Sequence, residues 1–376
     1  MKSIGLESGV VRLTGALGFD RRDAGIAARR LPDWTRPQLD PLTNYMVRLG
    51  SGVRVEFDTN SPSLSLTVLT SRTQATQQAP PPCAFDLTVD GEFVTTRLSD
   101  KGNLLQVDPG GGMQVVRGDA DVIRFDDLGN AGKQVAIWLP ANALVEMRDL
   151  QVADEAAVSQ TIRDVPRWVH YGSSISHCME ARSPCFTWPV VAARLAGVEL
   201  CNLGLGGSCH LDQYVARTIR DLPVDLISLK MGINVIGGDT LKARTFLPAL
   251  HGFLDTLREG KPDTPVLLVS PIYCPSTENH PGPQVNKDGV FVSVPDRDEV
   301  RGGSLTLVQV REIFKSAVEV RQAAGDVNLH YLSGLELFGE GDAADLPDNL
   351  HPNAAGYIRM GERFHELAFK NGVFAF

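Results

Sequence analysis

The chain of 376 residues lacks the long apolar segments that membrane proteins and exported proteins carry. No apolar run reaches the roughly 18 residues that a membrane-spanning helix needs. The first residues, MKSIGLESGVVRLTGALGF, also lack the continuous apolar stretch of a secretory signal. We therefore expect a cytoplasmic protein that does not enter a membrane.

The chain also lacks an excess of basic residues. It has 36 lysines and arginines against 45 aspartates and glutamates, which gives a net charge of −9. Nucleic acids and anionic membranes favour basic surfaces. We expect neither as a partner, and the sequence leaves the oligomeric state open.

Cysteine is scarce and scattered. The six positions are Cys83, Cys178, Cys185, Cys201, Cys209 and Cys274. Without an export signal, reduced thiols are expected rather than disulfides. The C-x-x-C pairs typical of zinc sites are missing around His177 and His210, so no metal is expected there. Cys209 also stands where a dinucleotide fingerprint would have its third glycine, so no nucleotide cofactor is expected. Cys274 follows an apolar run, but no base is assigned to it and a structural role is expected.

The first 150 residues alternate between apolar and polar with a period of two. Val53, Val55 and Phe57, for example, are separated by charged residues. The alternation predicts many short strands, with a hairpin turn at Asp90-Gly91 and no convincing helix. The proline-rich segment 74–82 is predicted to be an exposed loop. A chain of this length normally forms more than one domain. We predict an all-β sandwich or jelly-roll domain over residues 1–155.

In the second half the pattern changes to solid apolar runs separated by segments with a helical period. The runs occupy residues 167–171, 198–203, 224–231, 265–270 and 327–332. Phe246, Leu250 and Leu257 lie on one helical stripe, and Thr306 with Gln309 predicts the capping box of a second helix. Apolar strands that alternate with helices predict a parallel sheet covered on both faces. We predict a three-layer α/β/α domain over residues 166–376.

Glycine and polar residues stand directly after these predicted strands. They are Gly172-Ser173-Ser174, the loop 202–207, Gly232-Ile233-Asn234 and, before the last helix, the segment from Asp348 to His351. Each block alone could be ordinary turn or cap chemistry. In parallel α/β sheets, however, functional groups gather beyond the carboxyl ends of the strands. Four such blocks together therefore predict an active site.

The residue types in these blocks form a complete set for nucleophilic catalysis. The hydroxyl of Ser174 needs a base, which His351 can supply, and Asp348 lies one turn earlier to orient that base. A developing oxyanion needs preorganised donors. The backbone amides of Gly207 and Ser174 and the side-chain amide of Asn234 can provide them. We predict an enzyme that works through an acyl-Ser174 intermediate.

The four blocks resemble those of the SGNH (or GDSL) hydrolases, whose motifs are a G-D-S serine, a glycine loop, G-x-N-D and D-x-x-H in the same order. The resemblance covers residues 167–370. It implies a flavodoxin-like sheet and the catalytic roles just given to Ser174 and its partners. The sequence departs from the family at Ser173 and Val235, where the family has aspartates. Neither family position is a reacting group, so the implied triad is unaffected.

The β-rich first half narrows the resemblance. The whole chain resembles bimodular carbohydrate esterases, whose first domain is similar to a carbohydrate-binding module. It resembles more closely the salicylyl acyltransferase group of tetracycline-type polyketide tailoring, including at SPIYCPSTENHPGPQ and LPDNLHPNAAGY. This resemblance implies transfer of an aryl or other acyl group from acyl-CoA, as co-substrate, to a hydroxyl of a small-molecule acceptor, with no bound cofactor.

Two alternatives stay open. The enzyme could be a carbohydrate or small-molecule O-acyl esterase, since hydrolysis and transfer use the same residues. A carbohydrate-binding protein with a relic second domain is the non-enzymatic alternative. A relic would have no reason to keep all five of Ser174, Gly207, Asn234, Asp348 and His351, which argues against it.

Further residues are candidates for the substrate pocket. His210 and Asp212 follow the glycine loop and are expected to line it. The long polar segment 275–303 is expected to be a lid or an acceptor-binding wall, with a mobile surface loop as the alternative.

Overall fold

The computed structural model describes residues 1–74, 79–107, 112–294 and 302–375, so part of the predicted loop at 74–82 lies outside the described residues. The chain forms two units that are interleaved in sequence. The first unit contains Met1–Arg36, Val47–Asp164 and Ser183–Cys185. The second contains Pro37–Met46, Val165–Arg182 and Phe186–Phe376. A short segment from the N-terminal half therefore belongs to the C-terminal unit.

The first unit is a sandwich of two sheets. One has the strand order β10-β9-β6-β13-β4-β3, with β1 on β13 and β11 on β6; the other has the order β14-β5-β12-β7-β8, with β2 on β5. The strands of the first sheet are β1 (Lys2–Ile4), β3 (Gly18–Arg22), β4 (Gly25–Arg29), β6 (Leu64–Gln74), β9 (Asn103–Val107), β10 (Met113–Val116), β11 (Asp121–Phe125) and β13 (Leu144–Val152). Those of the second are β2 (Arg12–Thr14), β5 (Arg54–Thr59), β7 (Cys83–Val89), β8 (Glu92–Ser99), β12 (Lys133–Trp138) and β14 (Val158–Ser159).

The alternating residues of both sheets share one core. Val55 and Phe57 of β5, Leu66 of β6 and Ile137 of β12 are fully buried in the same cluster. The predicted hairpin is confirmed, since Asp90 (φ 50°) and Gly91 (φ 84°) turn the chain between β7 and β8. The pattern thus placed apolar side chains on the inner faces, as a sandwich requires.

The second unit is built on a parallel sheet with the order β16-β15-β17-β18-β21. Its strands are β15 (Arg167–Gly172), β16 (Glu199–Gly204), β17 (Leu226–Lys230), β18 (Val266–Val269) and β21 (Leu329–Leu332). Each of the five predicted apolar runs overlaps one of them. The order of these strands is that of flavodoxin-like sheets, so the predicted fold class is confirmed.

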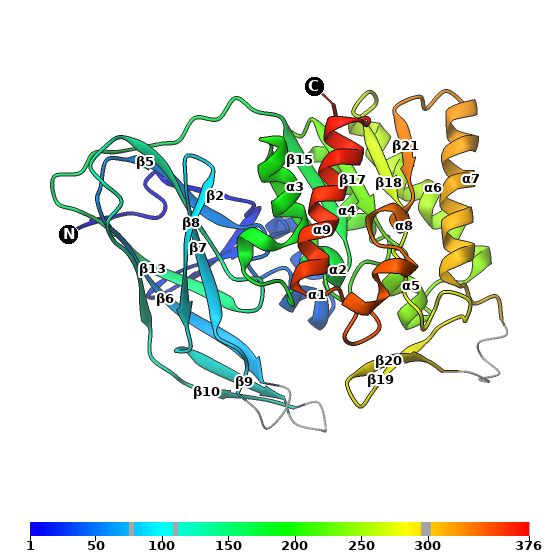
Figure 1. Cartoon of the computed structure of the whole chain (residues 1–376), viewed down its shortest axis with the longest axis horizontal. Coiled ribbons are helices and arrows are strands. Elements are labelled where there is room, and N and C mark those ends of the chain that lie inside the picture. Colours follow the sequence, from blue (N-terminus) through cyan, green and yellow to red (C-terminus); the bar gives the residue numbers. More distant parts are fainter. Residues whose placement is uncertain (75–78, 108–111, 295–301, 376) are drawn as a thin grey trace. The chain divides into compact units, whose positions relative to one another are not determined.

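Helices flank this sheet (Figure 1). Its larger helices are α3 (Trp188–Ala196), α4 (Gln213–Asp221), α6 (Ala243–Gly260), α7 (Leu307–Ala323) and α9 (Ala354–Phe364). Short helices are α1 (Pro41–Met46), α2 (Ser174–His177), α5 (Ile233–Gly238) and α8 (Gly334–Leu337), with 3-10 turns η1 (Asp33–Gln38), η2 (Pro184–Phe186) and η4 (Glu340–Asp345) and a final π-helical turn η5 (His365–Lys370). Helix α3 packs on α9, and α4 packs on α6.

The predicted helix signals are confirmed. Phe246, Leu250 and Leu257 are buried on one stripe of α6. At the start of α7 the Thr306 hydroxyl accepts from the Gln309 amide at 3.2 Å, while the Gln309 side chain accepts from the Thr306 amide at 2.9 Å. One prediction was wrong, since the N-terminal half does contain a helix, α1. The segment 275–303 contains a hairpin, and its role as a lid or acceptor-binding wall stays a prediction.

The hairpin consists of β19 (Gln284–Lys287) and β20 (Val290–Ser293). Asp288 and Gly289 form its turn with φ of 54° and 87°, the left-handed values that two-residue hairpin turns need. Residues 295–301 of the segment lie outside the described part of the chain.

No helix in the described residues is long and apolar enough to cross a membrane. All six cysteines are free thiols.

Candidate active site

The sheet brings the predicted blocks to one edge. Gly172, the last residue of β15, pairs with Gly204 of β16 and with Lys230 of β17, so these strands end at the same level. Ser174 then opens α2. Ser173 precedes it as the N-cap, where its buried hydroxyl accepts from the Ile175 amide at 3.3 Å. Ser173 therefore holds the turn, and Ser174 remains the hydroxyl at the sheet edge.

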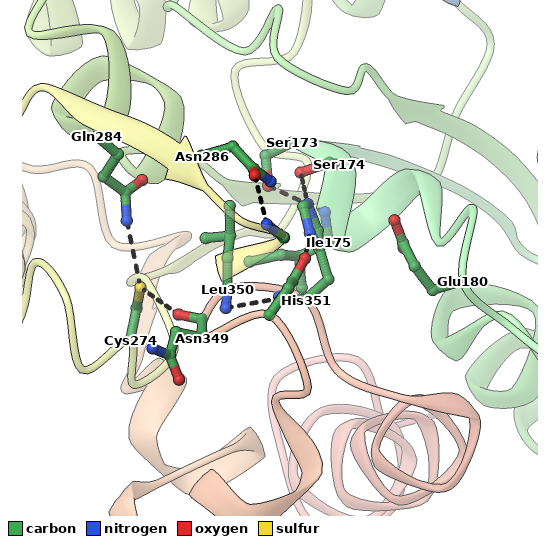
Figure 2. Close-up of polar contacts among 12 residues, drawn as sticks. Ser173, Ser174, Ile175, Glu180, Cys274, Gln284, Asn286, Asn349, Leu350 and His351 are labelled. Atoms are coloured by element: carbon green, nitrogen blue, oxygen red, sulfur yellow. Dashed lines mark hydrogen bonds and ion pairs between the residues drawn. The ribbon is translucent and has the colours of Figure 1, made fainter. Parts of the chain in front are cut away.

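Ser174, His351 and Asp348 form a chain of hydrogen bonds. The Ser174 Oγ lies 2.8 Å from Nε2 of His351 (Figure 2). Nδ1 of His351 lies 2.7 Å from Oδ2 of Asp348. The carboxylate can only accept, so Nδ1 carries the proton and Nε2 accepts from the serine. This is the tautomer that a histidine needs in order to deprotonate a serine.

The turn that carries Asp348 and His351 is held from within. Oδ1 of Asp348 accepts from the backbone amides of Leu350 at 2.9 Å and His351 at 2.7 Å. The thiol of Cys274, fully buried, donates to the carbonyl of Asn349 at 3.1 Å. These bonds explain how the D-x-x-H spacing brings a carboxylate onto the imidazole. They also give Cys274 the structural role that was expected.

The electrostatics of the site favour a charged aspartate and a basic histidine. Burial alone would raise the pKa of Asp348, but its bonds to the His351 side chain and backbone outweigh this and lower it. For His351, burial acts in the opposite direction and lowers the pKa. The hydrogen bond to Asp348 and the charges of Glu180 and Asp348 outweigh burial, so the pKa of His351 is raised above 6.5.

The glycine loop, residues 202–207, lies beside Ser174. A Cβ added to Gly206 would stand 3.6 Å from the Cβ of Ser174, and Gly207 has a φ of 66°. Oδ1 of Asn234 accepts from the Cys209 amide at 3.1 Å, which leaves the Nδ2 donor of Asn234 for another acceptor. Among the described residues, no acceptor engages the amides of Ser174 and Gly207. The described residues thus provide no acceptor for the amides of Ser174 and Gly207, and the role of these amides and of Asn234 Nδ2 as oxyanion donors stays a prediction.

His210 and Asp212 bond within the protein rather than extending into open space. His210 Nε2 donates to the Gly207 carbonyl at 3.0 Å, and its Nδ1 lies 2.9 Å from the Thr240 hydroxyl. The Asp212 carboxylate accepts from the Tyr171 hydroxyl and from the His210 amide, both at 3.3 Å. Burial raises the pKa of Asp212. These contacts hold the glycine loop, while contact with substrate stays a prediction.

Helix α1 also reaches the glycine loop, although no helix was predicted in this part of the chain. A Cβ on Gly206 would meet Met46 Cε at 2.9 Å, and one on Gly207 would meet Leu42 Cδ2 at 3.1 Å. Asp40 caps this helix by accepting from the amides of Leu42 and Thr43. Aspartate followed by Pro41 is a helix-start signal and could have revealed α1.

A second serine–histidine pair lies beneath the first. His170 is fully buried, with Nε2 2.7 Å from the Ser176 Oγ and Nδ1 2.7 Å from the Ser228 Oγ. Trp168 donates its indole N–H to Ser228 at 2.8 Å, so the Ser228 proton is free to point to Nδ1. Burial lowers the pKa of His170 far below its usual range. The pair is neutral and sealed, whereas His351 keeps 12% of its side-chain surface exposed.

The described residues contain no cluster of three histidine, cysteine, aspartate or glutamate side chains that could hold a metal ion.

The fold and the site define a class. A parallel α/β sheet that carries a serine, a histidine and an aspartate in one hydrogen-bonded chain at its carboxyl edge is an arrangement found in serine-dependent acyl hydrolases and acyltransferases. The model of the GDSL-like lipase/acylhydrolase family matches residues 170–359, and the chain belongs to this family.

Solved structures similar to the chain extend over both units. The salicylyl-acyltransferase SsfX3 from a tetracycline biosynthetic pathway is 28% identical, with a TM-score of 0.81 over 96% of this chain and 95% of that one. A protein from Bacteroides ovatus described as a GDSL-like lipase is 20% identical, with a TM-score of 0.68 over 94% of each chain. A family two carbohydrate esterase from Clostridium thermocellum, in complex with cellohexaose, is 13% identical, with a TM-score of 0.60 over 95% and 97%. A comparison with curated protein sequences gives no match.

Proposed function

We propose that the protein is an acyltransferase that moves an acyl group from acyl-CoA to a hydroxyl of a small-molecule acceptor through an acyl-Ser174 intermediate. The observation that carries the proposal is the hydrogen-bonded chain from Ser174 through His351 to Asp348, with distances of 2.8 and 2.7 Å. No bound cofactor is needed for this chemistry, since the thioester is itself the activated donor.

In the first half-reaction, His351 Nε2 takes the proton of the Ser174 hydroxyl as Oγ attacks the thioester carbonyl. The amides of Ser174 and Gly207 and the Nδ2 of Asn234 donate to the oxyanion. The C–S bond then breaks, and the imidazolium returns the proton to the leaving thiolate. Asp348 stabilises the imidazolium throughout, because its lowered pKa keeps the carboxylate charged.

In the second half-reaction, the acceptor hydroxyl gives its proton to His351 Nε2 and its oxygen attacks the acyl carbon. The bond from that carbon to Ser174 Oγ breaks, and Oγ regains the proton from the imidazolium. Water can replace the acceptor, which would make the enzyme an O-acyl esterase. The two outcomes use the same residues and differ in which nucleophile is held near the acyl group.

Two observations favour transfer of an apolar or aromatic acyl group. The similarity to SsfX3 extends over 96% of the chain. Leu42 and Met46 of α1 place apolar side chains against the glycine loop, where a bound acyl group would begin. Leu42 is 47% exposed, so its apolar surface is available for contact.

The test offers the enzyme a panel of aryl-CoA and alkyl-CoA thioesters, each with and without a polyhydroxylated aromatic acceptor. The proposal predicts ester product only with the acceptor and little free acid. Free acid at the same rate with and without acceptor would make the protein an esterase, and no turnover of any thioester would remove acyl-CoA as the donor.

A further inference from the structure

An aromatic side chain of the β19–β20 hairpin lies against His351, the proposed catalytic base. The ring of Phe291 meets the ring of His351 edge to face, with centroids 5.7 Å apart and planes at 76°. The mechanism above gives this ring no role. Yet His351 Nε2 is the atom that receives the proton of the second nucleophile, so a side chain beside this ring lies close to the path of that nucleophile.

The hairpin is tied to the turn that carries the triad. The Phe291 amide donates to the Asp348 carbonyl at 2.9 Å. On the other strand, the Gln284 amide group donates to the Ser276 hydroxyl at 2.7 Å. It also donates to the Cys274 sulfur at 3.5 Å (Figure 2). Because Cys274 also bonds the triad turn, both strands have a polar connection to it.

The hairpin is also tied to the helix that carries Asn234. The chain enters β19 through Gly282, where a Cβ would stand 1.7 Å from the carbonyl oxygen of Ile236 in α5. Only glycine allows this approach. At the other end, Oδ1 of Asn286 accepts from the Gly289 amide at 2.9 Å and closes the turn. The hairpin is therefore attached to the turn that carries Asp348 and to helix α5, and a hydrogen bond within the hairpin closes its own turn.

The two faces of the hairpin differ. Phe291 pairs across the strands with Asn286, so these side chains share one face, while Val285 pairs with Val292 on the other. Phe291 is half-buried and contacts His351, whereas Val285 is 41% exposed. The face with Phe291 is the one that meets the active site.

We propose that Phe291 directs the acyl-enzyme toward a hydroxyl acceptor with an apolar body and away from water. This inference rests on the proposed acyl-Ser174 intermediate. A water molecule must be held by hydrogen bonds to attack well, and a phenyl ring offers it none. The same ring gives an apolar acceptor a surface to pack on, which orients its hydroxyl toward His351. Phe291 is thus a positioning residue that acts on the second half-reaction.

The test measures partitioning with probes that do not depend on the natural substrate. Wild type and Phe291→Ala are supplied with p-nitrophenyl butyrate as donor and benzyl alcohol as acceptor, and the ratio of benzyl butyrate to butyrate is measured. We expect the ratio to fall at least about fivefold in Phe291→Ala, while the burst of p-nitrophenol that reports acylation changes less than about twofold. Phe291→Leu, which keeps apolar bulk, should give an intermediate ratio.

Val285→Ala is the matched control, because it removes apolar bulk from the opposite face of the same hairpin and should leave the ratio unchanged. An unchanged ratio in Phe291→Ala, with acylation intact, would overturn the inference. A parallel fall of burst and turnover at constant ratio would also overturn it, since the ring would then only support the fold. Absence of any acyl-Ser174 in wild type would instead overturn the proposed function.

Discussion

Two carboxylates raise the pKa of His351, the partly buried Asp348 and the exposed Glu180. Asp348 bonds its Nδ1 directly at 2.7 Å. Glu180 lies to one side of the imidazole in Figure 2, is exposed, and accepts from the buried Tyr357 hydroxyl at 2.9 Å. Both charges act to raise the pKa of His351. Asp348 acts through its hydrogen bond and its charge, whereas Glu180 acts through its charge, which salt can screen because the side chain is exposed.

The raised pKa fixes the direction of the pH dependence. The base works only when neutral, so kcat/KM should rise with pH and reach half its maximum above pH 6.5. Glu180→Gln removes a negative charge but can still accept from Tyr357. Its imidazolium is less stabilised, so its midpoint should lie at lower pH than that of wild type.

The measurement is kcat/KM for p-nitrophenyl butyrate across pH 5 to 9 at low and high ionic strength. The gap between the two midpoints should narrow with salt. Identical midpoints at low ionic strength would mean that Glu180 has no effect on the base.

Residue types alone could not tell the two serine–histidine pairs apart. Ser176 and His170 are as close as Ser174 and His351, with distances of 2.7 and 2.8 Å. His177, the nearest histidine in sequence, is buried and bonds the Gly204 carbonyl. The order of the family motifs selects Ser174. Burial, which only the folded chain reveals, gives the physical reason why the other pair is unsuited to meet substrate.

At the scale of elements, the glycine loop and α5 are coupled twice. Asn234 in α5 accepts from the Cys209 amide, and the His210 ring joins the Gly207 carbonyl to Thr240, just beyond α5. The Gly207 amide and the Asn234 side chain are the proposed oxyanion donors. The His210 bridge therefore sets the spacing between two elements that must act on one oxygen atom.

Replacements of Asn234 and His210 should distinguish the loss of an oxyanion donor from the loss of a side chain that positions the donors. Asn234→Ala removes a donor and should lower kcat by roughly 10²- to 10³-fold. His210→Ala leaves all donors in place but loosens the loop, and should lower kcat by about ten- to a hundredfold with little change in KM. His210→Gln can still donate to the Gly207 carbonyl and should recover much of the loss.

Steady-state kinetics with p-nitrophenyl butyrate would measure these effects. If His210→Ala raised KM while kcat stayed the same, the side chain would bind substrate, as the sequence suggested, instead of positioning the loop.

Sequence patterns predicted the elements with strong periods and missed the short ones. The five parallel strands and helices α6 and α7 carry buried runs or stripes long enough to show a period. Helix α1 has six residues, and its Leu42 and Met46 cover a loop some 160 residues away in sequence, so no local pattern announces them. The β19–β20 hairpin has only four residues per strand, and its alternation is broken by polar residues.

At the scale of the whole molecule, the chain does not divide at one point. Residues Pro37–Met46 leave the first unit to join the second, and Ser183–Cys185 belong to the first. Ser183 and the Cys185 amide both bond the buried Asp86 carboxylate of β7, at 2.6 and 2.7 Å. The fold class followed from periodicity in each half. These exchanged segments could not be predicted, because they depend on contacts between residues far apart in the sequence.

The account as a whole depends on Ser174 becoming acylated. Intact-protein mass spectrometry after rapid mixing with p-nitrophenyl butyrate should show one added butyryl group, located to Ser174 by peptide mapping. Ser174→Ala should show no added group and no turnover, while its circular dichroism and thermal unfolding match those of wild type. A butyryl group on any other residue, or turnover by a folded Ser174→Ala variant, would contradict the account.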